Sequence, residues 1–282
     1  VPADASGRLQ LGQWLARPDN PLPARVMANR AWHWLMGQGI VRTVDNFGTT
    51  GETPSHPALL DHLAARFAAD GWSVKRLVRQ IVLSRTYQLS TAANPAAVAI
   101  DPENRLRWRM DRRRLDAECI RDAMLAASGS LDRTPGGLTY LPAIATDYNY
   151  RHADVRRSVY SPVFRNALPE AFEAFDFADP SMVVGRRTVS TVAPQALYLM
   201  NHPFPQERAK AMAAALLADG GLDDPGRAMR AYRLTLGRPP TDAEGAVVTR
   251  FLAGADNSAA REAAWAQVIH ALFASTDFRY VN

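Results

Sequence analysis

Residues 56–85 read HPALLDHLAARFAADGWSVKRLVRQIVLSR, and this stretch determines the fold class that the sequence predicts. The apolar residues of its first half recur at the spacing of one helical face: Leu59, Leu60, Leu63 and Phe67. Those of its second half do the same: Leu77, Val78, Ile81 and Val82. Asp70-Gly71 is a typical stop between two helices, and Ser73 is suited to cap the second. The stretch therefore predicts two packed amphipathic helices.

Helical periodicity continues on both sides of this stretch, so we predict a mainly α, multi-helix globular domain. The further helices are expected between Ser6 and Pro18 and at about 22–36, 111–128, 168–175, 194–200, 204–218, 225–236, 242–253 and 259–274. Thr241 and Glu244 have the spacing of a capping box. Alternating polar and apolar residues predict a few short strands, at 105–110 and 156–163.

We predict that residues 1–282 form a single unit. Within it, the sequence suggests a subdivision into an N-terminal helical half, 1–90, and a C-terminal half, 91–282. It is 47% apolar and 22% charged, which is the composition of a globular protein. Charged or amide residues interrupt every apolar run, so no membrane-spanning segment is expected. Because the sequence begins Val1-Pro2 without Met or a leader, we expect a mature product or an excised domain.

Cys119 is the only cysteine, which excludes intrachain disulfides, cysteine-rich zinc sites and the C-x-x-C-H attachment of c-type haem. We therefore expect no cofactor in this chain. The net charge is +5, and all but two of the 33 basic residues are arginine, the exceptions being Lys75 and Lys210. Net charge by itself does not select a class of partner.

A long loop, residues 38–56, is rich in glycine and carries the first candidate site. Its Asp45, Glu52 and His56 are weak candidates for catalysis, because carboxylate and imidazole groups share acid and base roles or bind divalent metals. Their spacing matches no metal signature, and we predict no metal site. The alternative is structural: the carboxylates accept hydrogen bonds from loop amides, and His56 caps the following helix.

Residues of the preceding helix are candidates for binding a ligand or a partner. Asn29 and His33 lie on one face at i, i+4, with Arg30 and Trp34 on the adjacent face. They form a polar pocket with an aromatic wall, or else Asn29 and Arg30 fix the shape of the 38–56 loop. We choose Arg30 over a metal as the partner of Asp45.

Arg157 and Tyr160 are further binding candidates, since arginine forks match carboxylates and sulfates. Ser158 between them lacks the G-x-S-x-G elbow of a nucleophile. The segment from Arg105 to Arg114 resembles a nucleic-acid site in its arginine content, but we predict no nucleic-acid binding. Its arginines have acidic partners at i, i+4: Asp116 for Arg112 and Glu118 for Arg114.

Several motifs together resemble one known family. They are Asn29-Arg30-Ala31-Trp32, Gly37-Gln38-Gly39-Ile40-Val41, Asp45-Asn46-Phe47-Gly48, Pro54-Ser55-His56-Pro57, Arg156-Arg157-Ser158-Val159-Tyr160, Pro194-Gln195-Ala196-Leu197, Met200-Asn201-His202-Pro203 and Gly237-Arg238-Pro239-Pro240. In combination they resemble the planctomycete surface-domain family, the domain of unknown function 1553, and the resemblance covers nearly the whole chain.

The resemblance implies context rather than activity, because the family has no established activity. Its relatives place this domain at the C-terminal end of exported proteins, often after a c-type cytochrome domain. It therefore implies an extracytoplasmic location, in the periplasm or at the cell surface, and a c-type haem in a preceding domain. The expected partners are other domains of the same polypeptide or a neighbouring exported protein, with a glycan as a further candidate.

Two functions remain open from the sequence. The first is a non-catalytic binding or assembly module of an exported, haem-linked multidomain protein. The second is an enzyme component, a hydrolase or redox protein acting on polysaccharide, with its site near residues 45–56. Clustering of Asp45, Glu52 and His56 around one point would favour the enzyme, and their dispersal would favour the module.

Overall fold

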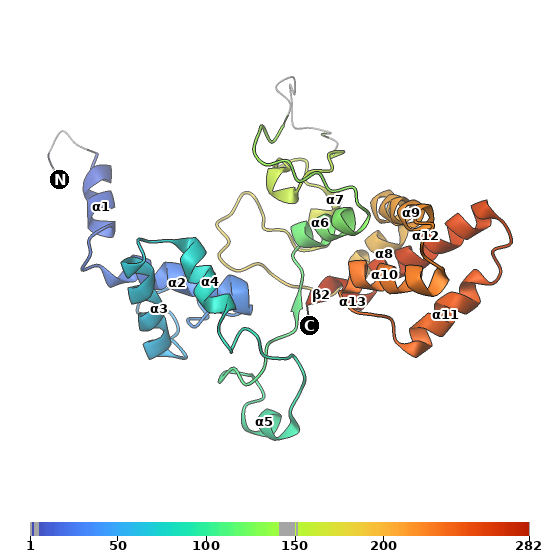
Figure 1. The fold of residues 1–282 in the computed structure, drawn as a ribbon. Helices are drawn as coiled ribbons and strands as arrows, with labels where there is room; N and C mark the ends of the chain where they lie inside the picture. Colours follow the sequence, from blue (N-terminus) through green and yellow to red (C-terminus); the bar gives the residue numbers. More distant parts are fainter. Residues whose placement is uncertain (1, 3–5, 141–149, 151, 282) are drawn as a thin grey trace. The chain divides into compact units, whose positions relative to one another are not determined.

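The structure is a computed structural model that describes residues 2, 6–140, 150 and 152–281. This part of the chain contains thirteen α-helices, one 3-10 helix and two strands of two residues each (Figure 1). The predicted mainly α class is therefore confirmed. The chain divides into two compact units, the first ending at Arg113 and the second spanning Arg114–Val281.

The first unit contains α1 (Arg8–Leu15), α2 (Pro21–Met36), α3 (Pro57–Ala69), α4 (Val74–Val82) and α5 (Pro95–Ile100). The second contains α6 (Ala117–Ala127), η1 (Ser158–Tyr160), α7 (Glu170–Ala174), α8 (Ala193–Asn201), α9 (Pro203–Ala218), α10 (Asp224–Leu236), α11 (Asp242–Leu252), α12 (Ser258–Ala274) and α13 (Thr276–Arg279). The strands β1 (Arg113–Arg114) and β2 (Tyr280–Val281) pair with each other.

Helices α2, α3 and α4 enclose the core of the first unit. Its buried residues include both halves of the stretch at 56–85 together with the inner face of α2: Trp32, Met36, Leu60, Leu63, Phe67, Leu77 and Ile81. Ser73 Oγ accepts a hydrogen bond from Arg76 N and so caps α4, as predicted. In contrast, α1 buries none of its residues, and its apolar side chains are exposed.

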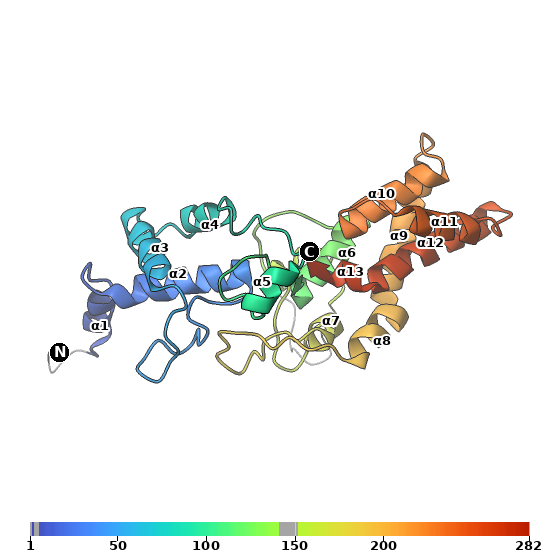
Figure 2. The ribbon, with the colours of Figure 1, turned by 90° about the horizontal axis from the view of Figure 1, so that it is seen from below.

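The second unit is built around α9 and α12, which lie side by side in both ribbon views (Figures 1 and 2). Trp265 and Phe273 of α12 and Met212 of α9 are almost fully buried in its core. The predicted capping box of α11 is present, with Thr241 and Glu244 each bonding the other's backbone N–H. Among the described residues, no helix combines the length and apolarity that a membrane crossing requires.

Neither predicted strand forms. In 105–110 the chain makes turns, because the carboxylate of Asp101 accepts the backbone N–H groups of Arg105 (2.9 Å) and Leu106 (2.7 Å). Asn104 adds to this turn with a left-handed backbone, φ 52°. Such local side-chain bonds compete with the ladder of a strand. The segment 156–163 instead contains η1, and only Arg156 makes a bridge, to Asp132.

Candidate functional site

The 38–56 loop of the first unit is held by Asn29 on α2. The side chain of Asn29 is fully buried; its Nδ2 donates to Val41 O over 3.0 Å, and Val41 N donates to its Oδ1 over 2.9 Å. A Cβ atom on Gly39 would lie 2.3 Å from Val41 O and 3.0 Å from the Asn29 amide, so only glycine fits there. Of the two alternatives that the sequence leaves open for Asn29, these bonds correspond to the second, in which Asn29 fixes the shape of the loop.

The rest of the loop is closed by its own polar groups. Thr43 Oγ1 donates to Asn46 O (2.8 Å) and accepts from Glu52 N (3.0 Å). Gly51 passes so close that a Cβ atom would lie 2.1 Å from Asn46 O. These contacts make the loop a rigid surface feature, since its backbone groups find partners without a strand or a helix.

The three weak catalytic candidates lie in different environments. Asp45 Oδ1 is 4.0 Å from Arg30 Nη1, the ion pair that the sequence predicts, and both side chains are largely exposed. Glu52 is exposed, and its backbone N–H donates a hydrogen bond to Thr43 Oγ1. His56 is the N-cap residue of α3, but its side chain makes no capping bond. The described residues contain no group of three or more His, Cys, Asp or Glu side chains that could hold a metal ion.

His56 does line a small cleft of 190 Å³ within the first unit. Its walls come from α2, the 38–56 loop, α3, the turn after α4 and the 101–111 turn: Trp32, Ile40, Ser55, His56, Leu59, Thr86, Leu106 and Arg107. We call it the His56 cleft. The loop that the sequence singled out therefore forms one wall of a concave site. Thr86 and Leu106 carried no sequence signal, because only the fold brings them to the loop.

Arg107 connects the two loops that border the His56 cleft. Its Nη1 donates to Asp111 Oδ2 over 2.8 Å and its Nη2 to Gln38 O over 3.3 Å, and the side chain is only 11% exposed. Its backbone has φ 57°, a left-handed conformation that is unfavourable for a residue with a Cβ atom. The carboxylate of Asp101 caps the preceding turn. The hydrogen bond from Leu106 N–H holds the pKa of that carboxyl group below its ordinary value.

The other predicted binding residues lie outside this cleft. Trp34 on α2 is 44% exposed, its ring meets His33 edge-on, and its carbonyl oxygen accepts from Arg113 Nη1 (2.8 Å). In the second unit, Arg157 is exposed, and the ring of Tyr160 packs under the guanidinium of Arg156 at 4.5 Å. Trp34 is therefore not among the residues that line the His56 cleft, and Arg157 and Tyr160 belong to the second unit.

The arginine-rich segment is occupied mainly by internal contacts. Arg114 pairs with Asp176 (2.8 Å) instead of the predicted Glu118, which forms two bonds with Arg187 (2.6 and 2.7 Å). The i, i+4 prediction for Arg114 is wrong because Arg114 precedes α6, which begins at Ala117. Burial raises the pKa of Asp176, but hydrogen bonds from Ser190 and Arg114 outweigh it, so the pKa lies below its ordinary value.

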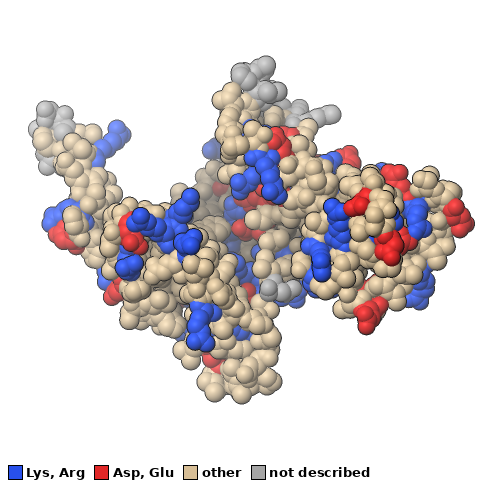
Figure 3. Space-filling view, viewed as in Figure 1, with Lys and Arg blue, Asp and Glu red and all other residues tan. Residues whose placement is uncertain are grey.

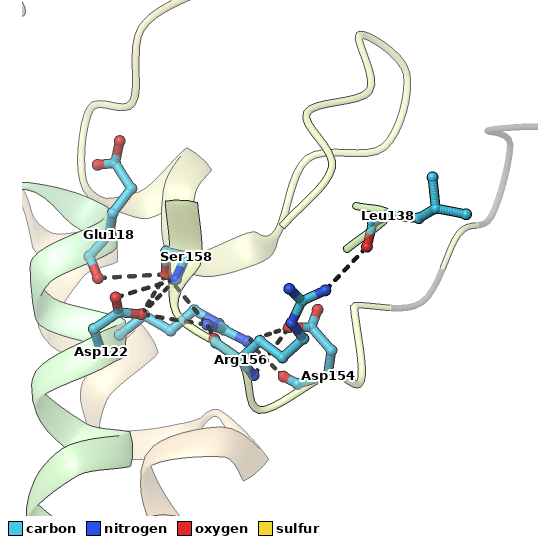
Figure 4. A network of polar contacts seen from close by, with 7 residues as sticks. Glu118, Asp122, Leu138, Asp154, Arg156 and Ser158 are labelled. Carbon is cyan, nitrogen blue, oxygen red and sulfur yellow. Dashed lines mark hydrogen bonds and ion pairs between the residues drawn. The ribbon is translucent and has the colours of Figure 1, made fainter. Parts of the chain in front are cut away.

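A buried polar network surrounds Ser158 in the second unit (Figure 4). Asp122 on α6 accepts both Ser158 N (2.8 Å) and Ser158 Oγ (2.6 Å). Arg121, only 5% exposed, donates to Arg156 O (2.8 Å) and Asp154 O (2.5 Å). Ser158 is itself 5% exposed, so its hydroxyl is a fixed part of the scaffold with little access to a substrate.

Charge on the visible surface is mixed. In the view of Figure 3, Lys and Arg atoms are scattered among Asp, Glu and uncharged atoms and do not gather into one continuous basic face. An extended basic stripe is the usual electrostatic footprint of a nucleic-acid site.

A family model described as PSD1, protein of unknown function (DUF1553), matches residues 7–252. No curated protein and no solved structure matches the chain. The chain therefore belongs to the PSD1 family of proteins of unknown function, DUF1553, in agreement with the resemblance of its motifs.

Proposed function

We propose that this chain is a non-catalytic binding module and that the His56 cleft is its ligand site. The observation that supports this most is the convergence of two rigid loops on a concave site that holds polar and apolar groups together. Asn29 fixes one loop, and Arg107 ties the other to it through Gln38 O. A preformed site of this kind loses little conformational entropy when a ligand binds.

The strained backbone of Arg107 adds a second argument. A left-handed conformation at a residue with a Cβ atom costs about 1–2 kcal/mol, and such strain concentrates at ligand sites. The strain is held by the hydrogen bonds of Arg107 to Asp111 and Gln38, which place its guanidinium at the cleft.

The alternative, a hydrolase or redox component acting on polysaccharide near residues 45–56, has less support. Hydrolysis of a glycoside normally uses two carboxyl groups on either side of the bond. Asp45 and Glu52 do not line the His56 cleft, and the acidic Asp111 near it is engaged by Arg107 and Asn104. His56 alone would have to supply all acid and base chemistry, so binding is the better interpretation.

The wider context of the module is also part of the proposal. We place it in an exported, haem-linked multidomain protein, with the haem in another domain and with those domains or a neighbouring exported protein as its partners. The family resemblance supports this context. The single cysteine of this chain cannot form a C-x-x-C-H site, so the haem would be attached to another domain. Extracytoplasmic location would be tested by fractionating cells that express the full-length protein.

The binding proposal is tested by protein-observed NMR with a panel of neutral, acidic and basic small molecules. We expect at least one class to shift the signals of Trp32 and Thr86, and Arg107→Ala to abolish the shifts. Arg85→Ala is the matched control, because Arg85 is exposed and does not line the cleft. A panel that leaves both signals unmoved, or turnover of a polysaccharide that Arg107→Ala eliminates, would overturn the proposal.

A further inference from the structure

We infer that the His56 cleft takes an uncharged, hydroxyl-bearing ligand of the size of one sugar ring. This inference rests on the proposed binding function and names the chemical class of the ligand. It follows from three properties of the cleft: its charge balance, the donors and acceptors that line it, and its apolar walls.

The charge balance of the cleft excludes a strongly ionic ligand. Among the described residues, Arg107 is the only Arg or Lys in its wall, and that guanidinium already pairs with Asp111 over 2.8 Å and with Gln38 O over 3.3 Å. The described part of the chain places no carboxylate on the wall to receive a cation. A bound anion would meet a cation whose charge is already compensated, so the cleft favours neutral polar groups.

His56 keeps one ring nitrogen for a ligand. Its Nδ1 lies 3.0 Å from Ser55 Oγ, and that hydroxyl lies 3.2 Å from Ile40 O, which also accepts Ser55 N over 2.9 Å. Because Nδ1 is engaged by Ser55, Nε2 is the nitrogen through which His56 meets a ligand hydroxyl, as donor or acceptor according to the tautomer.

Trp32 and Thr86 lie on the other walls. The indole N–H of Trp32 is buried and meets no acceptor among the described residues, which is unfavourable for a polar group removed from water. Thr86 contributes a hydroxyl that both donates and accepts. A ligand hydroxyl likewise donates to one group and accepts from another, and it therefore suits a cleft lined by the imidazole of His56 and the hydroxyl of Thr86.

The remaining walls are apolar and come from Ile40, Leu59 and Leu106. A pyranose ring has hydroxyl groups at its edge and C–H groups on its faces, so it matches a small site with both kinds of wall. The volume of 190 Å³ admits one ring and leaves no room for a longer chain inside the cleft. A polymer would therefore be bound through a single residue at its end or side.

The experiment compares three ligands that share one ring: methyl glucoside, glucuronate and glucosamine. Binding to the intact chain is measured by titration of the Trp32 and Thr86 NMR signals. We expect methyl glucoside to bind with a Kd on the order of 1 mM, because the site offers few polar groups and contacts only a single sugar ring. The two charged sugars should bind about tenfold more weakly, since a charge loses water without gaining a partner.

Two substitutions separate hydrogen bonding by His56 from a merely structural role. His56→Phe keeps an aromatic ring but removes the ring nitrogens, and it should weaken methyl glucoside binding about tenfold. His56→Gln keeps a hydrogen-bonding group and should restore part of that loss. His62→Phe is the matched control, because His62 lies on α3, is exposed and contacts Gln80 outside the cleft. Equal binding by the wild type and His56→Phe would contradict the inference.

The outcomes distinguish this inference from the proposed function. If glucuronate or glucosamine binds more tightly than methyl glucoside, the ligand class is wrong and the binding module stands. The same holds if no sugar moves the Trp32 and Thr86 signals while another small molecule does. If nothing in the wider panel moves them, both proposals fail.

Discussion

The side-chain amide of Asn29 and the peptide group of Val41 form two hydrogen bonds with each other across twelve residues of sequence. The pair reproduces the bonding between two strands, although one partner is a helical side chain. Val41 belongs to the core of the first unit, and the side chain of Asn29 is fully buried. The loop that borders the His56 cleft is therefore attached to the core at a fixed point.

Asn29→Ala should lower the free energy of unfolding of the first unit by about 2–3 kcal/mol, because both buried groups of Val41 lose their partner. Hydrogen exchange of residues 38–56 should accelerate in the same variant. Urea unfolding and exchange measured by mass spectrometry check the two effects. Gln80→Ala, which removes a partly exposed amide on α4, should change neither. An unchanged exchange rate at Val41 would show that the loop is held elsewhere.

Asp45→Asn should reduce the melting temperature only slightly, by the equivalent of less than about 1 kcal/mol, because its pair with Arg30 is long and exposed. Metal content should be the same in wild type and variant. Calorimetry and elemental analysis of both proteins, purified in parallel, measure these quantities. Unchanged stability together with loss of a bound metal would assign Asp45 to a metal site instead of the loop.

Arg121→Met should destabilise the second unit by about 3–5 kcal/mol, because removing one partner of a buried ion pair leaves the other charge uncompensated. Asp122 and Asp154 would both lose their cation. Arg133→Met, at an exposed position, is the matched control and should cost little. Hydrogen exchange around Ser158 is the readout, and slow exchange there in Arg121→Met would show that the network contributes nothing to order.

Glu244→Gln should destabilise the second unit by about 1 kcal/mol at neutral pH, because Glu244 completes the capping box and binds Arg238. The hydrogen bond from Arg238 lowers the pKa of Glu244 from 4.5 to about 2. A carboxyl group with a lowered pKa in the folded state stabilises above its unfolded pKa and loses that contribution as pH falls. The difference between wild type and variant should therefore be full above pH 4.5 and disappear towards pH 2.

Urea unfolding at pH 7 and pH 3 tests this dependence. A difference of the same size at both pH values would mean that the carboxylate charge is not what Arg238 recognises. Asn257→Ala removes the N-cap of α12, which accepts the backbone N–H of Ala260 over 2.8 Å, without involving a titrating group. Its effect on stability should not vary over the same pH range, which makes it the matched control.

The elements that the sequence predicts well are those with local causes. Ser73 caps α4 and Thr241 with Glu244 caps α11 because each bond joins residues three apart in the chain. The helical faces at 56–85 are buried as their spacing indicates. The contact of Asn29 with the loop was also predictable, since a buried amide on a helix beside a glycine-rich loop has few other partners.

The elements that the sequence mispredicts depend on distant partners or on competing side chains. The alternation of polar and apolar residues at 156–163 predicts a strand. Instead, Arg121 and Asp122 of α6 form hydrogen bonds with the backbone and hydroxyl groups of this segment. The strand predicted at 105–110 does not form, because the side chains of Asp101 and Asn104 accept the backbone N–H groups that a neighbouring strand would otherwise bind. Most of the His56 cleft was likewise invisible, because its walls come from five separate stretches of the chain.

Helix α6 has one face in the core, with Ile120 and Met124, and another that binds charged and backbone groups of a segment with little secondary structure of its own. That segment therefore cannot melt by itself without exposing Arg121 and Asp122, and α6 cannot leave the core without releasing the segment. Unfolding of both should be one cooperative event. An irregular segment, which in most proteins unfolds locally at low free energy, is here bonded to a helix of the core.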